Sequence, residues 1–270
     1  MGERCILITG TIVQNVVKTI PEDPKTRRQA YLDNLKYYSD ILDDPIIFLE
    51  NSTYSFDNDF GFKNLFNDKN IKLIKFPVSR GVSQGKGFQE FEMLDKAVEQ
   101  LSGVYSSFVK ISGRYRYLNI TEIIDYSNGD LTIDLLRRKH EAVTSIFYVT
   151  FDFYKDYLLN VYQEVDDING DSIEQIIYKL VMNENLLDNI RFFRVHPMVN
   201  IFTQNSEQKT NKHLSSLKIS ASNIERKILR FLYVFSSPRN ALLMLVLVNE
   251  CMPTNNLHQT GKTISFAEVT

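Results

Sequence analysis

The segment that most constrains the fold runs from residue 79 to residue 115, where a Gly-rich basic loop, an amphipathic helix and a short strand follow one another. Apolar residues three or four apart predict a helix over residues 88–101. β-branched and aromatic residues crowd into residues 105–111 and predict a strand. The polar turn Ser112–Tyr115 then lies at the carboxyl end of that strand, which in open α/β sheets is the edge where ligands bind.

The first half of the chain alternates between strand and helix patterns. Apolar runs predict further strands over residues 5–11, 45–50 and 71–78, and helices are expected over residues 24–42 and near residues 60–66. Such alternation predicts an α/β fold with βαβ units and a mainly parallel central sheet flanked by helices. After residue 115 we expect strands over residues 131–136, 143–151 and 192–202, and helices over residues 121–126, 154–162 and 173–182.

Composition narrows the class of protein. Hydrophobic residues make up 43% and charged residues 24%, as in ordinary soluble globular proteins, and a net charge of −2 gives no support for a nucleic-acid binder. Cys5 and Cys251 lie far apart without metal-binding spacing, which indicates a reducing compartment. The most apolar run, residues 241–248, is far shorter than the roughly 20 residues that span a bilayer. We therefore expect a cytoplasmic protein without a nucleic-acid partner.

Motifs for several other chemistries are incomplete. Gly261-Lys262-Thr263 lacks the upstream glycine of a phosphate-binding P-loop. The four histidines are scattered without the spacing of a metal site or a catalytic triad, and no serine lies in a G-x-S-x-G context. Hydrolase and metalloenzyme functions therefore have little support.

Polar residues follow the successive predicted strands. A single polar strand end is explained by the residue types that turns prefer. Several such strand ends together, some carrying Arg or Lys, indicate a binding site for a phosphorylated ligand. Glycine permits close backbone approach, hydroxyl and N–H groups donate hydrogen bonds, and arginine supplies a bidentate charge. The candidate ligand-binding residues are Thr9, Gly10, Thr11, Glu50, Asn51, Ser52, Arg80, Gly81, Lys86, Lys110, Ser112, Gly113, Arg114 and Tyr115.

The order of these parts resembles the nucleotide-sugar glycosyltransferases of the GT-A fold over roughly residues 4–200. Residues 45–52 (PIIFLENS) look like the second strand of that family, residues 81–100 like its loop and helix, and residues 108–115 (FVKISGRY) like its strand that leads to the metal-binding DxD motif. A Lys-x-[Ser/Thr]-Gly-Arg-Tyr turn looks like bacterial enzymes that build capsule, O-antigen (lipopolysaccharide) or other surface glycans. The resemblance implies a nucleotide-sugar donor, a glycan or lipid-linked acceptor, and a place at the inner face of the membrane.

One departure from the family changes the expected chemistry. Ser112-Gly113-Arg114 stands where the DxD should be and offers no carboxylate, whereas Arg114 and Lys110 offer positive charge. The family's metal neutralises the leaving diphosphate, and a guanidinium or ammonium could do so electrostatically. We therefore expect metal-independent or weakly metal-dependent transfer, with Arg114, Arg80 or Lys86 facing the phosphates.

Inverting transfer needs a base that removes the proton of the acceptor hydroxyl. In many GT-A enzymes this is an acidic residue at the start of a late helix, and residues 151–180 look like that region. The resemblance makes Glu174 the first candidate for the catalytic base and Asp152 the second. It also implies that Glu50 contacts the nucleobase or the ribose of the nucleotide, and that Thr9 and Thr11 line the nucleotide.

The resemblance also suggests a domain organisation. Residues 1–204 form the GT-A-like domain, with a nucleotide-binding half at about 1–117 and an acceptor half at about 118–204. Residues 205–252 are expected to form a loop and a helical appendage, and residues 253–270 a tail. The helix expected over residues 224–248 could be a peripheral membrane anchor, a contact in a homodimer, or a helix packed on the sheet.

Two other functions stay open. A sugar nucleotidyltransferase normally carries a Gly-rich signature directly after the first strand, and residues 9–13 (TGTIV) match it poorly. A non-catalytic nucleotide- or glycan-binding module on the same fold would explain the missing DxD.

Overall fold

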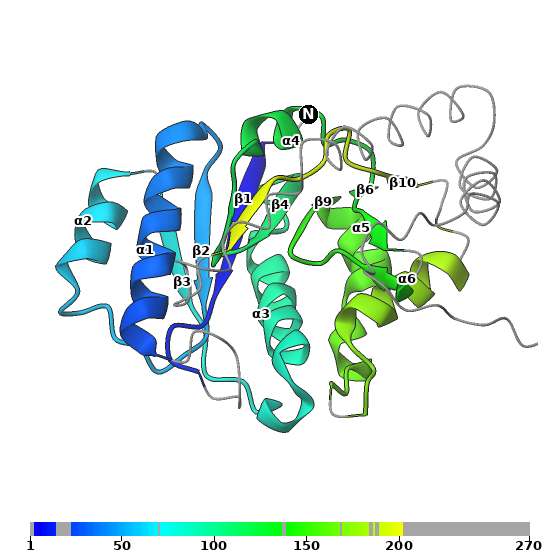
Figure 1. The fold of residues 1–270 in the computed structure, drawn as a ribbon, viewed down its shortest axis with the longest axis horizontal. Helices are drawn as coiled ribbons and strands as arrows, with labels where there is room; N and C mark the ends of the chain where they lie inside the picture. The colour runs from blue at the N-terminus through cyan, green and yellow to red at the C-terminus, as the bar shows by residue number, and fades with distance from the viewer. Residues whose placement is uncertain are drawn as a thin grey trace, which may run out of the picture.

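A seven-stranded sheet with helices on both faces forms the centre of the computed structural model, which describes residues 3–14, 23–69, 71–136, 139–167, 169–183, 186 and 189–201 (Figure 1). Its strands are β1 (Arg4–Gly10), β2 (Ile46–Glu50), β3 (Ile71–Lys75), β4 (Ser107–Ser112), β6 (Leu131–Thr132), β9 (Ile146–Thr150) and β10 (Ile190–Arg191). The helices are α1 (Pro24–Ile41), α2 (Phe60–Asp68), α3 (Lys86–Leu101), α4 (Ile120–Asp125), α5 (Phe151–Phe153) and α6 (Ile173–Asn183). Two small antiparallel pairs join β5 (Tyr115–Tyr117) to β11 (Val199–Ile201) and β7 (Leu135–Leu136) to β8 (Glu141–Ala142).

The sheet is mainly parallel, as predicted. The strand order is β10-β6-β9-β4-β1-β2-β3, and the neighbours β4, β1, β2 and β3 all run in the same direction. β9 lies between β4 and β6 and is antiparallel to both. The carboxyl ends of β1, β2 and β4 therefore meet at one edge, while the carboxyl end of β9 lies at the opposite edge.

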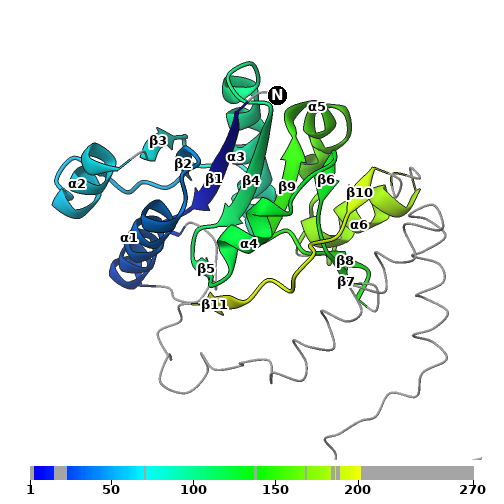
Figure 2. The same cartoon turned by 90° about the horizontal axis from the view of Figure 1, so that it is seen from above.

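Each face of the sheet carries its own apolar core, because successive strand residues point to opposite faces. Cys5 and Leu7 of β1 pack with α3, α5 and α6, whereas Ile6 and Ile8 pack with α1, α2 and α4. Figure 2, seen from above, shows α3 and α5 on one side of the sheet and α1 and α4 on the other. The fold thus has three layers, helix–sheet–helix.

Several elements differ from the sequence-based predictions, each with a local cause. The strand expected over residues 71–78 ends at Lys75, two residues before Pro77, which has no N–H for a sheet hydrogen bond. The helix expected over residues 154–162 is a π-helical turn (η3, Tyr154–Leu158) and a 3-10 turn (η4, Val161–Glu164), separated by the left-handed Asn160 (φ 68°). A turn of 3-10 helix (η1, Val82–Gln84) precedes α3.

Two predicted strands are broken up. Residues 131–136 form the short β6 and β7, because the two halves pair with different strands: β6 with β9 and β10, and β7 with β8. The strand expected over residues 192–202 is absent as a unit: β10 ends at Arg191, and β11 begins only after Pro197. The expected loop, helix and tail of residues 205–270 lie outside the described residues. Within the described part, no helix combines the length and apolar character needed to cross a membrane.

Candidate functional site

A cavity of about 630 Å³ opens at the carboxyl ends of β1 and β4. Its walls come from both helical layers: α1 contributes on one side, and α3, the segment 141–145 and the start of α6 contribute on the other. Of the predicted site residues, the structure brings together Thr9, Gly10, Thr11, Lys86, Ser112, Gly113, Arg114, Tyr115 and Glu174 as lining of this one cavity. The sheet edge predicted from the strand ends is therefore where the largest group of candidates lies.

The turn that carries Arg114 is held in place by α1. α1 begins at Pro24 after the N-cap Asp23, whose carboxylate accepts a hydrogen bond from the N–H of Thr26. From its buried face, the Asn34 amide donates to the carbonyl of Gly113 (2.9 Å), and the Tyr38 hydroxyl donates to the carbonyl of Tyr115 (2.8 Å). These bonds fix the backbone on both sides of Arg114, so its side chain leaves a rigid turn.

Gly113 allows the ends of β1 and β4 to approach closely. Its N–H donates to the carbonyl of Thr9 (2.8 Å), and a Cβ at this position would lie 2.7 Å from that oxygen and 2.9 Å from the ring of Tyr31. Any side chain here would push the turn away from β1. The glycine is therefore needed for the cavity's shape as well as for the turn.

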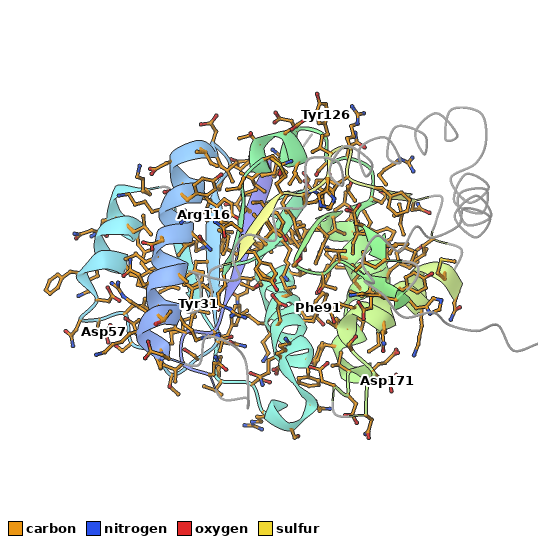
Figure 3. All side chains as sticks on the ribbon, viewed as in Figure 1. Tyr31, Asp57, Phe91, Arg116, Tyr126 and Asp171 are labelled. Carbon is orange, nitrogen blue, oxygen red and sulfur yellow. The ribbon has the colours of Figure 1, made fainter. Side chains whose placement is uncertain are left out.

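Arg27 of α1 is a cavity residue that the sequence reasoning missed. It is buried, it donates from Nε to the carbonyls of Thr11 (2.9 Å) and Ile12 (3.2 Å), and its guanidinium lies over the ring of Tyr31 (labelled in Figure 3). Burial lowers the pKa of Arg27, and the nearby positive charge of Arg114 lowers it further. Arg27 and Arg114 both line the cavity, and an anion bound there would offset the repulsion between their charges. The available signal was the i, i+4 spacing of Arg27 and Tyr31 on the predicted helix.

Lys110 does not face the cavity as the sequence reasoning expected. It is wholly buried in β4, where its ammonium pairs with Oε1 of Glu90 (2.7 Å) and donates to Ser112 Oγ (2.8 Å) and to the Thr144 carbonyl (2.7 Å). These three contacts use all of its protons. Lys110 therefore supports the floor of the cavity and is not placed to contact a phosphate.

Glu90 of α3 is the second cavity residue that was missed. Its Oε1 accepts hydrogen bonds from the Thr9 hydroxyl and from the Ser112 hydroxyl (3.1 Å), in addition to the Lys110 pair. Burial alone would raise the pKa of Glu90, but the charge and hydrogen bond of Lys110 and the two hydroxyls outweigh it and lower the pKa. Glu90 is thus a fixed negative charge in the floor.

Glu174, the first candidate for the base, lies on the wall opposite the arginines. It occupies the first turn of α6, after Ser172, whose hydroxyl accepts a hydrogen bond from the N–H of Gln175. The Thr144 hydroxyl donates to Glu174 Oε1 (2.8 Å), and the Thr144 carbonyl accepts from Lys110. A continuous chain of contacts therefore links Glu90, Lys110, Thr144 and Glu174 along the cavity.

The turn Glu50–Ser52 has a different place from the one expected. All three residues are buried and none lines the cavity. Glu50 accepts from the N–H of Ile12 (3.2 Å) and from the Ser52 hydroxyl, and Asn51 accepts from the hydroxyl of Thr11 (2.7 Å). The turn therefore packs against the loop after β1 and supports it. Because Glu50 is buried there, it has no access to the nucleobase or the ribose of a nucleotide.

Three other candidates lie outside the cavity. Arg80 is exposed, and Gly81 is buried against the ring of Phe88. Asp152 follows β9, whose carboxyl end is at the other edge of the sheet, and its side chain is 95% exposed. Neither Arg80 nor Asp152 is placed to contact a ligand in the cavity.

The residues at the DxD position do not fit a divalent metal. Ser112, Gly113 and Arg114 supply no carboxylate, and the neighbouring carboxylate of Glu90 is already paired with Lys110. Mg²⁺ is usually held by one or two carboxylates together with substrate phosphates and waters, and this turn supplies no carboxylate for that role. Over the described residues, no three His, Cys, Asp or Glu side chains gather in a way that could hold a metal ion.

Comparison with known proteins gives distant structural likenesses. No protein-family model matches the chain, and no curated protein sequence matches it. Among solved structures, it is similar to a Desulfovibrio desulfuricans G20 protein described as a nucleotide-diphospho-sugar transferase, with 16% identity, a TM-score of 0.49, and coverage of 83% of this chain and 94% of that one. It is also similar to mouse xyloside xylosyltransferase 1 in its apo form, with 9% identity, a TM-score of 0.38, and coverage of 71% and 85%. Likenesses this distant assign no activity, so we argue function from the chain's own residues.

Proposed function

We propose that this chain is a glycosyltransferase that takes a sugar from a nucleotide-activated donor bound in the cavity at the ends of β1 and β4. The observation that carries the proposal is that two arginines, Arg27 and Arg114, and the carboxylate of Glu174 line this same cavity. The arginines suit a diphosphate, and the carboxylate suits a base. The resemblance of the order of sequence segments to GT-A glycosyltransferases supports the same assignment.

The residues divide the reaction between them. Glu174 accepts the proton of the acceptor hydroxyl as its oxygen forms a bond to the anomeric carbon of the donor sugar. The bond from that carbon to the diphosphate oxygen breaks, and the electron pair leaves with the diphosphate. Arg114 stabilises the charge that develops there, supported by Arg27, because fixed charges in a partly desolvated site need no reorganisation. No step in this scheme uses a metal ion.

The setting that we propose follows from the turn Lys110–Tyr115. Its resemblance to enzymes of capsule and O-antigen synthesis supports a role in bacterial surface-polysaccharide assembly, with a glycan or lipid-linked acceptor. The enzyme would then work in the cytoplasm at the inner face of the membrane.

A thermal-shift screen of the full chain tests the proposed function. UDP-, GDP-, CMP- and dTDP-sugars are added singly, with EDTA or with Mn²⁺, because a ligand that binds only the folded state raises the melting temperature. We expect stabilisation by one nucleotide series in EDTA. Stabilisation by none of them would overturn the proposal, and binding without any donor turnover would favour the non-catalytic binding module.

A further inference from the structure

The charges of the cavity are divided between its walls. Arg27 of α1 and Arg114 of the β4–β5 turn line one side, and Lys86 at the start of α3 is a cation on the other side. Carboxylates line the other side and the floor, contributed by Glu90, Glu141, Asp167 and Glu174. A ligand that fits both parts has an anionic portion next to a portion that carries no negative charge and donates hydrogen bonds.

Glu90 has one oxygen available in the floor. The hydrogen bonds that Glu90 accepts from the hydroxyls of Thr9 and Ser112 both end on Oε1, and Lys110 pairs with that same oxygen. The side chain is 26% exposed and lines the cavity, although its helix is otherwise packed on the sheet. Oε2 makes no hydrogen bond to any described residue. A carboxylate held by three donors on one oxygen is therefore oriented to accept from a ligand with the other.

Tyr115 shows that the anionic and cationic groups converge. Burial raises the pKa of its phenol, the charges of Glu90 and Glu174 raise it further, and the charge of Arg114 lowers it. Tyr115 lines the cavity together with Glu90, Glu174 and Arg114. The backbone also connects the two groups, because Ser112, two residues before Arg114, donates a hydrogen bond to Glu90.

We propose that Glu90 accepts hydrogen bonds from hydroxyl groups of the transferred sugar and thereby selects a neutral sugar over one that carries a carboxylate. The inference rests on the proposed function and deepens it by naming the class of donor. A hydroxyl donates to Oε2 of Glu90, and such a bond to a charged acceptor is among the stronger ones in proteins. A uronic or nonulosonic acid would instead place its own carboxylate among those of Glu90, Glu141 and Glu174, where like charges repel.

Matched pairs of donors provide the test. Affinities of the full chain in EDTA are measured by calorimetry for UDP-glucose and UDP-glucuronate, UDP-galactose and UDP-galacturonate, and GDP-mannose and GDP-mannuronate. CMP-N-acetylneuraminate, UDP, GDP, CMP and dTDP complete the panel. We expect the neutral donor to bind at least about tenfold more tightly than its carboxylated partner, because that is the size of one charge-assisted hydrogen bond gained or lost.

Variants assign the preference to Glu90. In Glu90→Gln we expect the preference to fall by at least about threefold, because the charged acceptor for the sugar hydroxyl and one of the charges that repel the uronate are gone. Glu99→Gln, an exposed position on the same helix, is the control and should keep the wild-type preference. Because Glu90→Gln also removes the partner of Lys110, Glu90→Asp is the second variant. It keeps the charge but withdraws it by one methylene, and should weaken the neutral donor several-fold.

The outcomes separate the inference from the proposed function. If a nucleoside diphosphate binds but the paired sugars bind equally, or the uronate binds more tightly, or the Glu90 variants keep the wild-type preference, the role of Glu90 is wrong and the glycosyltransferase proposal stands. If no nucleotide and no sugar nucleotide in the panel binds, the proposed function fails and the inference fails with it.

Discussion

The ammonium of Lys110 lies 2.7 Å from Oε1 of Glu90, and Lys110 is wholly buried beneath the floor of the cavity. Hydrogen bonds connect the pair to both walls of the cavity. Ser112, which begins the arginine turn, bonds to both partners, and Thr144, which holds Glu174, accepts from Lys110. Removing one charge would leave the other in the floor without its partner, which is the costly case for a buried ion pair.

Lys110→Met should destabilise the fold by about 3–5 kcal/mol at pH 7, because Glu90 keeps its charge without the ammonium. Lys96→Met is the control. Lys96 pairs with Glu92 on the partly exposed side of α3, and its loss should cost no more than about 1 kcal/mol. Urea unfolding measures both. Equal losses in the two variants would contradict a structural role for the buried pair.

The pH dependence of Lys110→Met gives an independent check. In the wild type the pKa of Glu90 is lowered, so its contribution to stability is present above the unfolded value of about 4.3 and is lost as the pH falls through the folded pKa. In the variant, burial without Lys110 should raise that pKa. The stability difference between the two proteins is therefore expected to shrink as the pH is lowered toward 4.

Gly113→Ala should displace the arginine turn. The new methyl would meet the Thr9 carbonyl at 2.7 Å, and overpacking of this kind costs about 1–3 kcal/mol. We expect a lower melting temperature together with weaker nucleotide binding. Gly103→Ala is the comparison, since no atom lies within 4 Å of its added methyl and only its left-handed backbone (φ 115°) is strained. Loss of ligand binding in Gly103→Ala as well would show that the effect is not local.

Asp95→Asn should stabilise the protein at pH 7.5. Burial raises the pKa of Asp95 to about 6, with Glu99 and Glu92 adding to the rise, and hydrogen bonds from Tyr154 and Asn160 oppose it. The pKa of Asp95 in the folded state exceeds the unfolded value of about 3.9. The stability that protonated Asp95 contributes is therefore complete at low pH and is lost as the pH rises to about 6.

Asparagine is isosteric with aspartate and avoids this loss, so a gain of about 1–2 kcal/mol is expected at pH 7.5 and almost none at pH 4. Thermal unfolding across that range measures it. The control is Asp57→Asn at an exposed position (labelled in Figure 3), which should show no such trend. A destabilised Asp95→Asn at pH 7.5 would mean that the ionised carboxylate is the form the fold requires.

Glu174→Gln should lower the rate of transfer by about 10² to 10⁴-fold without abolishing donor binding, because the amide cannot accept the proton. Asp152→Asn is the matched test of the other acidic candidate. Since Asp152 is exposed beyond the opposite edge of the sheet, its variant should transfer at the wild-type rate. A full rate in Glu174→Gln would remove Glu174 from the mechanism.

The edge of the sheet that carries the cavity was predictable from the sequence because strand ends are local signals. Thr9, Ser112 and Arg114 each follow a short apolar run, and parallel strands bring such ends together. The periodicity of α1 and α3 was equally readable. What these patterns cannot specify is how a helix is rotated and docked against the sheet.

The residues that were missed or misplaced depend on that docking. Arg27 and Glu90 carry charges that a helical pattern normally assigns to solvent, yet α1 and α3 pack so that both reach the cavity. The sequence predicts Lys110 as a cation near the ligand-binding edge of the sheet. In the fold, however, Glu90 of α3, about twenty residues earlier in the chain, pairs with Lys110. Glu50 was a candidate from the strand ends, with a nucleobase or ribose contact implied by the resemblance, but it is buried and bonds the N–H of Ile12 in the loop after β1.

Donor turnover by the full chain in excess EDTA tests the central claim most directly. With the donor identified by the nucleotide screen, the wild type should keep its full rate in EDTA. Arg114→Gln should be slower by about 10² to 10³-fold, and Mn²⁺ should not restore it. Arg80→Gln, at an exposed arginine outside the cavity, should behave as the wild type. A rate that vanishes in EDTA and returns with Mn²⁺, or an undiminished rate in Arg114→Gln, would contradict charge stabilisation by Arg114.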